Sequence, residues 1–301
     1  MNKMRDFCGL VSIIGRPNVG KSTLLNRLIE QKISITSRKS QTTRNNILGI
    51  KTKDKHQMVF IDTPGVHINA SKVMNKVLNQ SALGAIEDAD LIIFMLQRNK
   101  INTLDELILE RLKEVNTKKI CVINKVDQVA SINSLLPVIE KLRSENNFAE
   151  IIPVSAKTGK NINELENMIC QNLPENNHLY DSNTKFLAKE SFMISEIIRE
   201  KIIRFLGEEL PHETYVQLQK LEDKESIINI DAEIIVARES QKGIVVGKNG
   251  SKLKKIGEKA RIDLEKFFDK KVFLKTWVKT KKNWNNDSDF ISSLGIGSLY
   301  D

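Results

Sequence analysis

The feature that most constrains the fold of this 301-residue chain is the segment GRPNVGKS at residues 15–22, which fits the pattern GxxxxGKS. It follows an apolar run, residues 9–14, and opens an amphipathic stretch, residues 21–30. Between a strand and a helix, such a loop turns its backbone N–H groups inward around phosphate, and the helix N-terminus adds partial positive charge. The pattern therefore predicts a phosphate-binding loop.

Apolar runs alternate with helical patterns through the first half of the chain, which predicts an α/β fold with a mostly parallel sheet and helices on both faces. The predicted strands are residues 9–14, 58–61, 91–96, 119–123 and 150–154. A polar, turn-forming stretch, residues 173–178, indicates the end of this unit. We therefore expect a P-loop domain over residues 1–176 and a linker over residues 177–184.

The second half of the chain shows a different order of elements. A long helix at residues 185–206 precedes strands at 214–222 and 227–238, helical segments around 247–250, and a strand at 272–278. Gly247 and Gly250 frame a GxxG loop between two helices, and the whole order is that of a type II KH domain, an α+β fold. We expect this domain over residues 185–284 and assign no structure to the tail, residues 285–301.

Three further motifs, each at the end of a predicted strand, identify the nucleotide. Asp62 begins DTPG and suits a carboxylate that holds Mg²⁺ through water, while the N–H of Gly65 can contact a γ-phosphate. NKVD at residues 124–127 places the Asp127 carboxylate to accept hydrogen bonds from guanine N1–H and the exocyclic amine, which adenine lacks. SAK at residues 155–157 can bring backbone N–H groups to the guanine carbonyl. Together the motifs indicate GTP rather than ATP.

We therefore predict a GTP site with a Mg²⁺ ion. Its nucleotide-binding residues are Gly15, Arg16, Pro17, Asn18, Val19, Gly20, Lys21, Ser22, Thr23, Asp62, Thr63, Pro64, Gly65, Val66, Asn124, Lys125, Val126, Asp127, Ser155, Ala156 and Lys157. The predicted catalytic residues are Lys21, which reaches the β and γ phosphates, Thr43 and Gly65. Ser22 and Thr43 are predicted to ligate Mg²⁺.

The polar segment at residues 34–46 has the length and composition of a switch loop. By analogy with related GTPases, Thr43 rather than Thr42 is expected to close onto Mg²⁺; the alternative is that both belong to a solvated loop. Val66 stands where many GTPases carry a water-orienting glutamine, so slow intrinsic hydrolysis is expected. Asn18 is a candidate for holding a monovalent cation, K⁺, against the phosphates, and the alternative is that it only supports the loop.

Positive charge is concentrated in one short stretch. The chain has a net charge of +9, and residues 238–284 alone hold 15 Lys/Arg against 5 Asp/Glu. Such a concentration is typical of a protein that binds a phosphate backbone, or of one that meets an anionic membrane surface. With the GxxG loop, it predicts an RNA-binding site formed by Gly247, Lys248, Asn249, Gly250, Ser251, Lys252, Lys254 and Lys255.

Other notable side chains fit structural roles better. The second domain's core is expected to contain Phe267, Phe268 and Phe273, whereas Trp277 and Trp284 could pack there or stack on bases. The spacing of a metal or disulfide site is absent from Cys8, Cys121 and Cys170, which are expected to be reduced thiols of a cytoplasmic protein. No apolar run reaches the ~18 to 20 residues that cross a bilayer.

This combination of motifs resembles the Era family of bacterial GTPases over nearly the whole chain. Beyond the nucleotide motifs, the resemblance rests on GRPNVGKSTLLN at 15–26, ISITSRKSQTTR at 33–44, SEIIREK at 195–201, RFLGEELP at 204–211, ESQKG at 239–243 and WVKTKKNW at 277–284. The tail after Trp284 matches the family less clearly.

The resemblance implies a monomeric GTPase whose KH domain binds the 3′ end of 16S ribosomal RNA and which assists maturation of the 30S ribosomal subunit. It also implies a cytoplasmic protein, peripherally present at the inner membrane, and hydrolysis stimulated by K⁺ and RNA without a catalytic glutamine, in agreement with Val66. Two hypotheses stay open: a GTP-controlled switch that acts on RNA, and an RNA-binding module in which GTP is mainly structural. A membrane-surface GTPase is a third.

Overall fold

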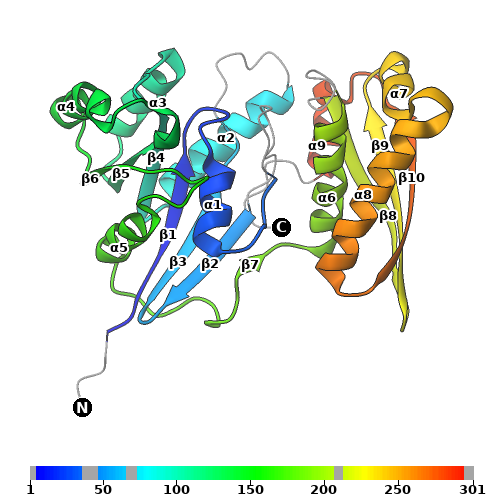
Figure 1. Cartoon of the computed structure of the whole chain (residues 1–301), viewed down its shortest axis with the longest axis horizontal. Coiled ribbons are helices and arrows are strands. Elements are labelled where there is room, and N and C mark those ends of the chain that lie inside the picture. The colour runs from blue at the N-terminus through cyan, green and yellow to red at the C-terminus, as the bar shows by residue number, and fades with distance from the viewer. Residues whose placement is uncertain (1–4, 36–46, 66–72, 207–212, 295–301) are drawn as a thin grey trace.

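A seven-stranded sheet organises the first domain of the computed structural model, which describes residues 5–35, 47–65, 73–206 and 213–294 (Figure 1). The sheet has the order β6-β5-β4-β1-β3-β2-β7. Its strands are β1 (Phe7–Ile14), β2 (Ile47–Lys53), β3 (His56–Asp62), β4 (Leu91–Gln97), β5 (Lys118–Asn124), β6 (Glu150–Pro153) and β7 (Phe186–Leu187). All neighbours from β6 to β3 are parallel, whereas β2 and β7 are antiparallel to the strands beside them.

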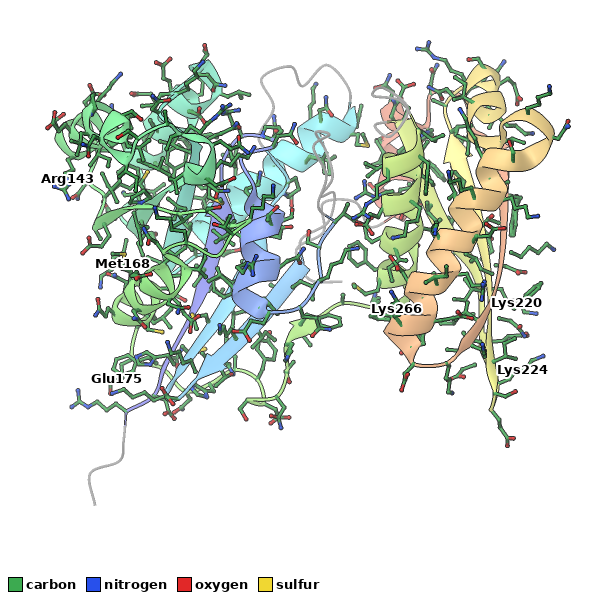
Figure 2. The ribbon with its side chains drawn as sticks, in the orientation of Figure 1. Arg143, Met168, Glu175, Lys220, Lys224 and Lys266 are labelled. Carbon is green, nitrogen blue, oxygen red and sulfur yellow. The ribbon has the colours of Figure 1, made fainter. Side chains whose placement is uncertain are left out.

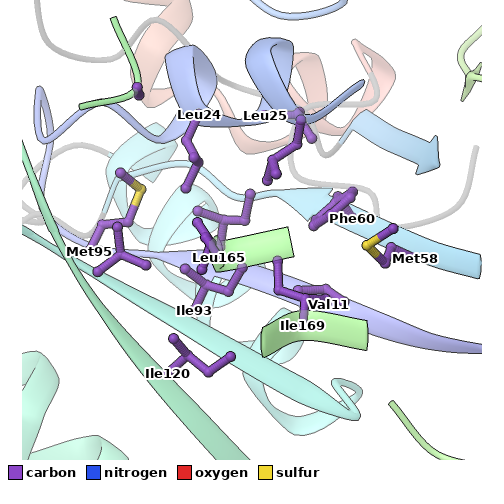
Figure 3. Close-up of a cluster of buried hydrophobic side chains, with 14 of the residues drawn as sticks. Val11, Leu24, Leu25, Met58, Phe60, Ile93, Met95, Ile120, Leu165 and Ile169 are labelled. Carbon is purple, nitrogen blue, oxygen red and sulfur yellow. The ribbon is translucent and has the colours of Figure 1, made fainter. Parts of the chain in front are cut away.

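Helices cover both faces of this sheet, as the alternation of strands and helices predicts. They are α1 (Lys21–Ile29), α2 (Val73–Glu87), α3 (Thr103–Lys113), α4 (Leu136–Glu145) and α5 (Ile162–Asn172). Side chains of α1 and α5 share one core with alternate strand residues such as Phe60 and Ile93 (Figure 3). The other face, with Ile92 and Phe94, packs against α2, α3 and α4. Because both faces are covered, the central strands are apolar throughout, and the predicted fold class is confirmed.

The strand β7 lies inside the span expected for the second domain. The long helix expected from residue 185 begins instead at Glu190 as α6 (Glu190–Phe205). Before it, Phe186 pairs with Gly49 of β2, and Leu187 pairs with Leu48. Main-chain pairing with β2 thus takes residues 186–187 out of the helix and adds them to the first domain's sheet.

A buried glutamine fixes the chain that leads to β7. Gln57 on β3 has no exposed surface, and its Oε1 accepts from the backbone N–H groups of Leu179 at 2.8 Å and Tyr180 at 3.0 Å. Its Nε2 donates to the carbonyl of Tyr180 at 2.7 Å. Buried amides retain their position when their hydrogen bonds are satisfied, so the connection is held against the sheet.

The second domain is a three-stranded sheet with helices on one side. It contains β8 (Thr214–Asp223), β9 (Ile227–Val236) and β10 (Lys271–Thr280), in the order β10-β9-β8, and the helices α6, α7 (Glu239–Val246) and α8 (Ser251–Phe268). The strand β10 runs parallel to β9, and β8 runs antiparallel to it. The order of elements is that of the expected type II KH domain, which is confirmed.

One core expectation in this domain is wrong. Phe273 is 57% exposed, because side chains alternate along β10: Val272 packs against the helices, and Phe273 points to the opposite, solvent face. Phe267 and Phe268 are half-buried and stack edge to face, with Phe268 packed against the core.

The tail forms a structured contact between the two domains. In the structure it begins one residue earlier than the expected boundary, at Trp284, with a turn of 3₁₀ helix, η5 (Trp284–Asn286), followed by a short helix, α9 (Ser288–Ser293). Trp284 is fully buried, and its indole N–H donates to the carbonyl of Glu213 at 3.1 Å. It shares a core with Met74 and Leu78 of α2. The tail therefore holds α2 of the first domain against the KH domain.

None of the helices in the described ranges is long and apolar enough to cross a membrane. Within the same ranges, Cys8 and Cys121 are buried thiols and Cys170 is partly buried.

Candidate nucleotide and nucleic-acid sites

The phosphate loop joins β1 to α1, and two of its glycines occupy positions that no other residue fits. Gly15 has φ 153°, and a Cβ there would lie 2.7 Å from the carbonyl oxygen of Met95. Gly20 has φ 108°, and a Cβ there would collide with the side-chain amide of Asn124. Glycine permits both the positive φ and the close approach, so the loop has the tight path that a phosphate cradle requires.

Lys21 lies across this loop. The side chain is almost fully buried, and its Nζ donates to the carbonyls of Gly15 at 3.0 Å and Arg16 at 3.3 Å. Burial lowers the pKa of Lys21 to about 8, and the nearby Asp62 carboxylate partly opposes that shift. Phosphate oxygens can replace the two carbonyls and keep the ammonium charged, as the predicted role of Lys21 demands.

The residues expected at the Mg²⁺ site come together around Asp62. The buried Asp62 Oδ2 accepts from Ser22 Oγ at 3.0 Å and from Ser34 Oγ at 2.7 Å. Hydroxyl and carboxylate oxygens are the hard ligands that Mg²⁺ prefers, so the set fits the ion, which would neutralise phosphate charge. Thr43, with its alternative Thr42, lies outside the described residues, as does Val66.

The DTPG motif approaches the phosphate loop through its backbone. The Thr63 hydroxyl is buried and donates to the carbonyl of Ile13 at 2.8 Å, so that side chain supports the sheet. A Cβ on Gly65 would lie 3.0 Å from the Pro17 side chain, which shows how closely the motif abuts the loop. The expected contact of the Gly65 N–H with a γ-phosphate stays a prediction.

Side chains of the NKVD motif form hydrogen bonds to the phosphate loop as well as to the SAK loop. The Asn124 amide donates to the carbonyl of Val19 at 2.8 Å, and its oxygen accepts from the N–H of Ala156 at 3.0 Å. Lys125 Nζ donates to the carbonyl of Asn18 at 2.6 Å. These side chains join three loops at the carboxyl ends of the strands.

The carboxylate predicted to read the guanine base, that of Asp127, is exposed and held in one orientation. Asp127 Oδ1 accepts from the buried Ser155 hydroxyl at 2.6 Å, and the side chain otherwise faces solvent. Val19 and Val126 have buried side chains in the two cores, so a contribution to nucleotide binding would come from their backbone. Thr23 is half-buried on α1, Pro64 is buried, and Lys157 is exposed beside the base site.

A supporting residue of the base site lies outside the sequence motifs. Arg27, in the last turn of α1, donates from Nε to the carbonyl of Ala156 at 3.2 Å and from a terminal nitrogen to that of Lys157 at 2.6 Å. Its guanidinium thus holds the SAK loop in place. Nothing in the local pattern signals this contact, because 129 residues separate Arg27 from Ala156.

The GxxG loop forms the second candidate site. It lies between α7 and α8, with φ 72° at Gly247 and φ 77° at Gly250. A Cβ on Gly247 would lie 2.9 Å from that of Lys252, whereas a Cβ on Gly250 would meet no atom within 4 Å. Open space at Gly250 leaves room for a sugar-phosphate chain to approach the backbone.

The predicted RNA-binding residues share one exposed end of α8. Exposed side chains surround the loop at Lys248, Asn249, Ser251, Lys252, Lys254 and Lys255. Lys255 Nζ lies 5.2 Å from the ring centroid of Phe205 on α6. Three other lysines of the domain, Lys220, Lys224 and Lys266, lie toward the end of the domain opposite α7 (Figure 2).

A sheet whose strands end in GKS, DTPG, NKVD and SAK motifs, followed by a KH domain, defines a P-loop GTPase with an RNA-binding module. Residues 10–125 match the family model described as 50S ribosome-binding GTPase, and residues 209–285 match the KH domain model. The GTPase Era of Haemophilus influenzae is 46% identical over 292 residues, 97% of each chain. The chain belongs to the Era family of GTPases and hydrolyses GTP.

Solved structures of this family agree over the full length. A crystal structure of Era in complex with MgGDPNP and nucleotides 1506–1542 of 16S ribosomal RNA has a TM-score of 0.93 and 35% identity, covering 96% of this chain and 99% of that one. An Aquifex aeolicus Era variant bound to GDP·AlF4⁻ has a TM-score of 0.92 with the same identity and coverage.

Replacing Asp127 with Asn should change the base that the site selects. The amide would point a donor at the guanine amine, so we expect GTP to bind at least about 100-fold more weakly and xanthosine triphosphate to bind in its place. Competition against fluorescent GDP measures both affinities. Asp181→Asn, at an exposed carboxylate of the connection, is the matched control; unchanged guanine selectivity in Asp127→Asn would refute the base-reading role.

The low pKa of Lys21 predicts a pH dependence of nucleotide binding. The free protein carries a charged Lys21 below pH 8 and loses that charge as the pH rises through about 8, whereas bound phosphate keeps the amine protonated. GDP affinity should therefore be constant below that pH and about tenfold lower at pH 9 than at pH 7. Lys21→Arg stays charged and should show no such loss; parallel curves for the two proteins would contradict the assignment.

Proposed function

We propose that this GTPase binds the 3′ end of 16S ribosomal RNA through its KH domain and assists assembly and maturation of the 30S subunit, using Mg²⁺ at the nucleotide site. The observation that carries the proposal is the GxxG loop, with open space at Gly250 and exposed lysines on the first turns of α8. A relative of nearly the same structure is bound to nucleotides 1506–1542 of that RNA.

Contacts between the domains favour the switch hypothesis over an RNA-binding module with structural GTP. Lys32 Nζ forms an ion pair at 2.6 Å with Glu200 of α6, whose side chain is 2% exposed. Two residues further along the chain, the Ser34 hydroxyl donates to the Asp62 carboxylate, which is predicted to hold Mg²⁺. A change at Asp62 on nucleotide binding can therefore reach the KH domain through a segment of three residues.

A second connection runs through α2. This helix begins at Val73, eight residues after Gly65, and its Met74 and Leu78 pack against Trp284 and Ile291 of the tail. Packed contacts have discrete arrangements rather than continuous ones. The position of α2 would thus be transmitted to the KH domain, which supports control of RNA binding by the nucleotide.

The geometry of Asn18 supports the proposal that K⁺ assists hydrolysis. The residue is exposed at the mouth of the loop with φ 64°, and Lys125 donates to its backbone carbonyl rather than to its side-chain carboxamide, which could face a cation. In hydrolysis, water attacks the γ-phosphorus and the bond to the β-phosphate oxygen breaks, so negative charge must be stabilised where an arginine finger acts in other GTPases. A cation beside Asn18 would supply that charge.

Subunit assembly would place the protein in the cytoplasm, and its being a monomer stays a prediction from the family resemblance. Peripheral contact with the inner membrane stays a prediction from the family resemblance.

Gly250→Asp should separate RNA binding from nucleotide binding. Aspartate tolerates a positive φ and has room at this position, so the fold should persist while its charge repels the phosphate backbone. We expect affinity for a single-stranded RNA of the 16S 3′ end to fall by at least about tenfold, with GDP affinity unchanged. Fluorescence anisotropy measures both.

Ser144→Asp, on the exposed face of α4, adds the same charge away from the site and should leave RNA binding intact. Wild-type RNA affinity in Gly250→Asp would remove the loop from the site. The binding-module hypothesis holds instead if the wild type binds RNA with the same affinity in every nucleotide state and if RNA does not change the rate of GTP hydrolysis.

Asn18→Gly should abolish K⁺ activation. Glycine retains the left-handed backbone and removes the carboxamide, so hydrolysis in KCl should fall to the rate in NaCl, while GDP affinity is retained. Asn18→Asp keeps an oxygen at the same place and should retain a K⁺ response. Equal stimulation by KCl in all three proteins would assign Asn18 to loop support alone.

A further inference from the structure

The N-terminus of α3 contains a carboxylate with two functions. Asp105 forms a capping box with Asn102: its Oδ2 accepts from the Asn102 N–H at 3.1 Å, and its own N–H donates to Asn102 Oδ1 at 3.0 Å. The same Oδ2 also accepts from Nε of Arg16, the second residue of the phosphate loop, at 3.0 Å. The cap is thus joined to a loop 89 residues away.

Helix capping alone does not account for this aspartate. At the N3 position of a capping box a neutral Gln side chain can accept the same hydrogen bond as an acid, yet Asp105 carries a carboxylate with no exposed surface. Its Oδ1 is buried without a hydrogen-bond partner among the described residues. Burial raises the pKa of Asp105, while the Asn102 N–H and the Arg16 guanidinium oppose the shift. A charge kept in so unfavourable a place needs its cationic partner.

Arg16 carries the connection to the phosphates. Its side chain is 18% exposed and turned toward α3, while its carbonyl oxygen accepts from Lys21 Nζ at 3.3 Å. One residue therefore contacts Asp105 through its guanidinium and the phosphate-binding lysine through its backbone. A shift of Arg16 would move the carbonyl against which Lys21 rests.

We infer that Asp105 is a positioning residue for nucleotide binding: its carboxylate holds Arg16, and through Arg16 it sets the path of the phosphate loop and the place of Lys21 before GTP arrives. Arg16 therefore serves the site through its side-chain anchor on α3 and its backbone. Preorganisation of this kind strengthens ground-state and transition-state binding alike, so it affects KM rather than kcat.

Asp105→Asn tests the inference because it removes the negative charge that pairs with the Arg16 guanidinium, while an amide oxygen in place of Oδ2 can still accept from the Asn102 N–H and retain the cap. We expect the Kd for GDP and the KM for GTP to rise about tenfold and kcat to stay within about twofold. The preference for GTP over inosine triphosphate should not change, since Asp127 is untouched. A globally disturbed fold would alter that preference and kcat as well.

Asn102→Ala is the matched control. It removes the Asn102 half of the capping box and leaves the bond between Arg16 and Asp105, so α3 should be destabilised with nucleotide affinity unchanged. If Asn102→Ala weakens GDP binding as much as Asp105→Asn does, the effect belongs to the helix cap and the inference is wrong.

Arg16→Gln and the double variant complete a thermodynamic cycle. Each single change should weaken GDP binding about tenfold, and the double change should weaken it about tenfold rather than 100-fold, because both remove one interaction. Arg16→Gln also tests the inference if Asp105→Asn does not fold. Additive losses, or a loss in Arg16→Gln with none in a folded Asp105→Asn, would show that Arg16 contacts the nucleotide directly and would overturn the inference.

Discussion

The whole nucleotide site depends on one buried amide. Asn124 is 2% exposed; its side-chain NH2 donates to the phosphate loop and its side-chain oxygen accepts from the SAK loop. The amide occupies a space that only a glycine at position 20 leaves open. Loops at the ends of three parallel strands would otherwise be free to move independently. Hydrogen bonds of a buried amide, in a site of low dielectric, are stronger than the same hydrogen bonds in water. The phosphate site and the base site therefore form a single rigid unit.

Sequence motifs and the alternation of elements predict both folds. A phosphate loop such as residues 15–22 works only between a strand and a helix, and the order of helices and strands around the GxxG loop is that of a KH domain. Local sequence patterns do not predict contacts between distant segments of the chain. Arg27 and Asp105 lie in ordinary amphipathic helices and have no local pattern, since their roles depend on loops 89 residues or more away. The wrong placement of Phe273 has a similar origin: aromatic content predicts burial on average, whereas the register of β10 decides which face each residue joins.

The structure of the tail also depends on contacts that its own sequence does not indicate. Its Ser/Asn/Asp-rich composition indicates no core, yet Trp284 and Ile291 are among the most buried residues of the chain. They are buried between α2 of the first domain and the KH domain's own Ile235 and Ala237, so their role follows from domain docking rather than from the hydrophobic pattern of the tail itself. The ion pair between Lys32 and Glu200 is another contact between the domains, two residues before Ser34, whose hydroxyl donates to Asp62.

The short strand β7 limits how the KH domain can move. It is paired with β2 through residue 187, and α6 begins at residue 190, so only two residues separate a fixed point on the first domain's sheet from the second domain. Two extended residues span roughly 7 Å. Any rearrangement between the domains must therefore be a rotation about this pivot rather than a separation. The two domains stay joined at this point in every orientation, so their mutual contacts re-form within one chain and do not depend on protein concentration.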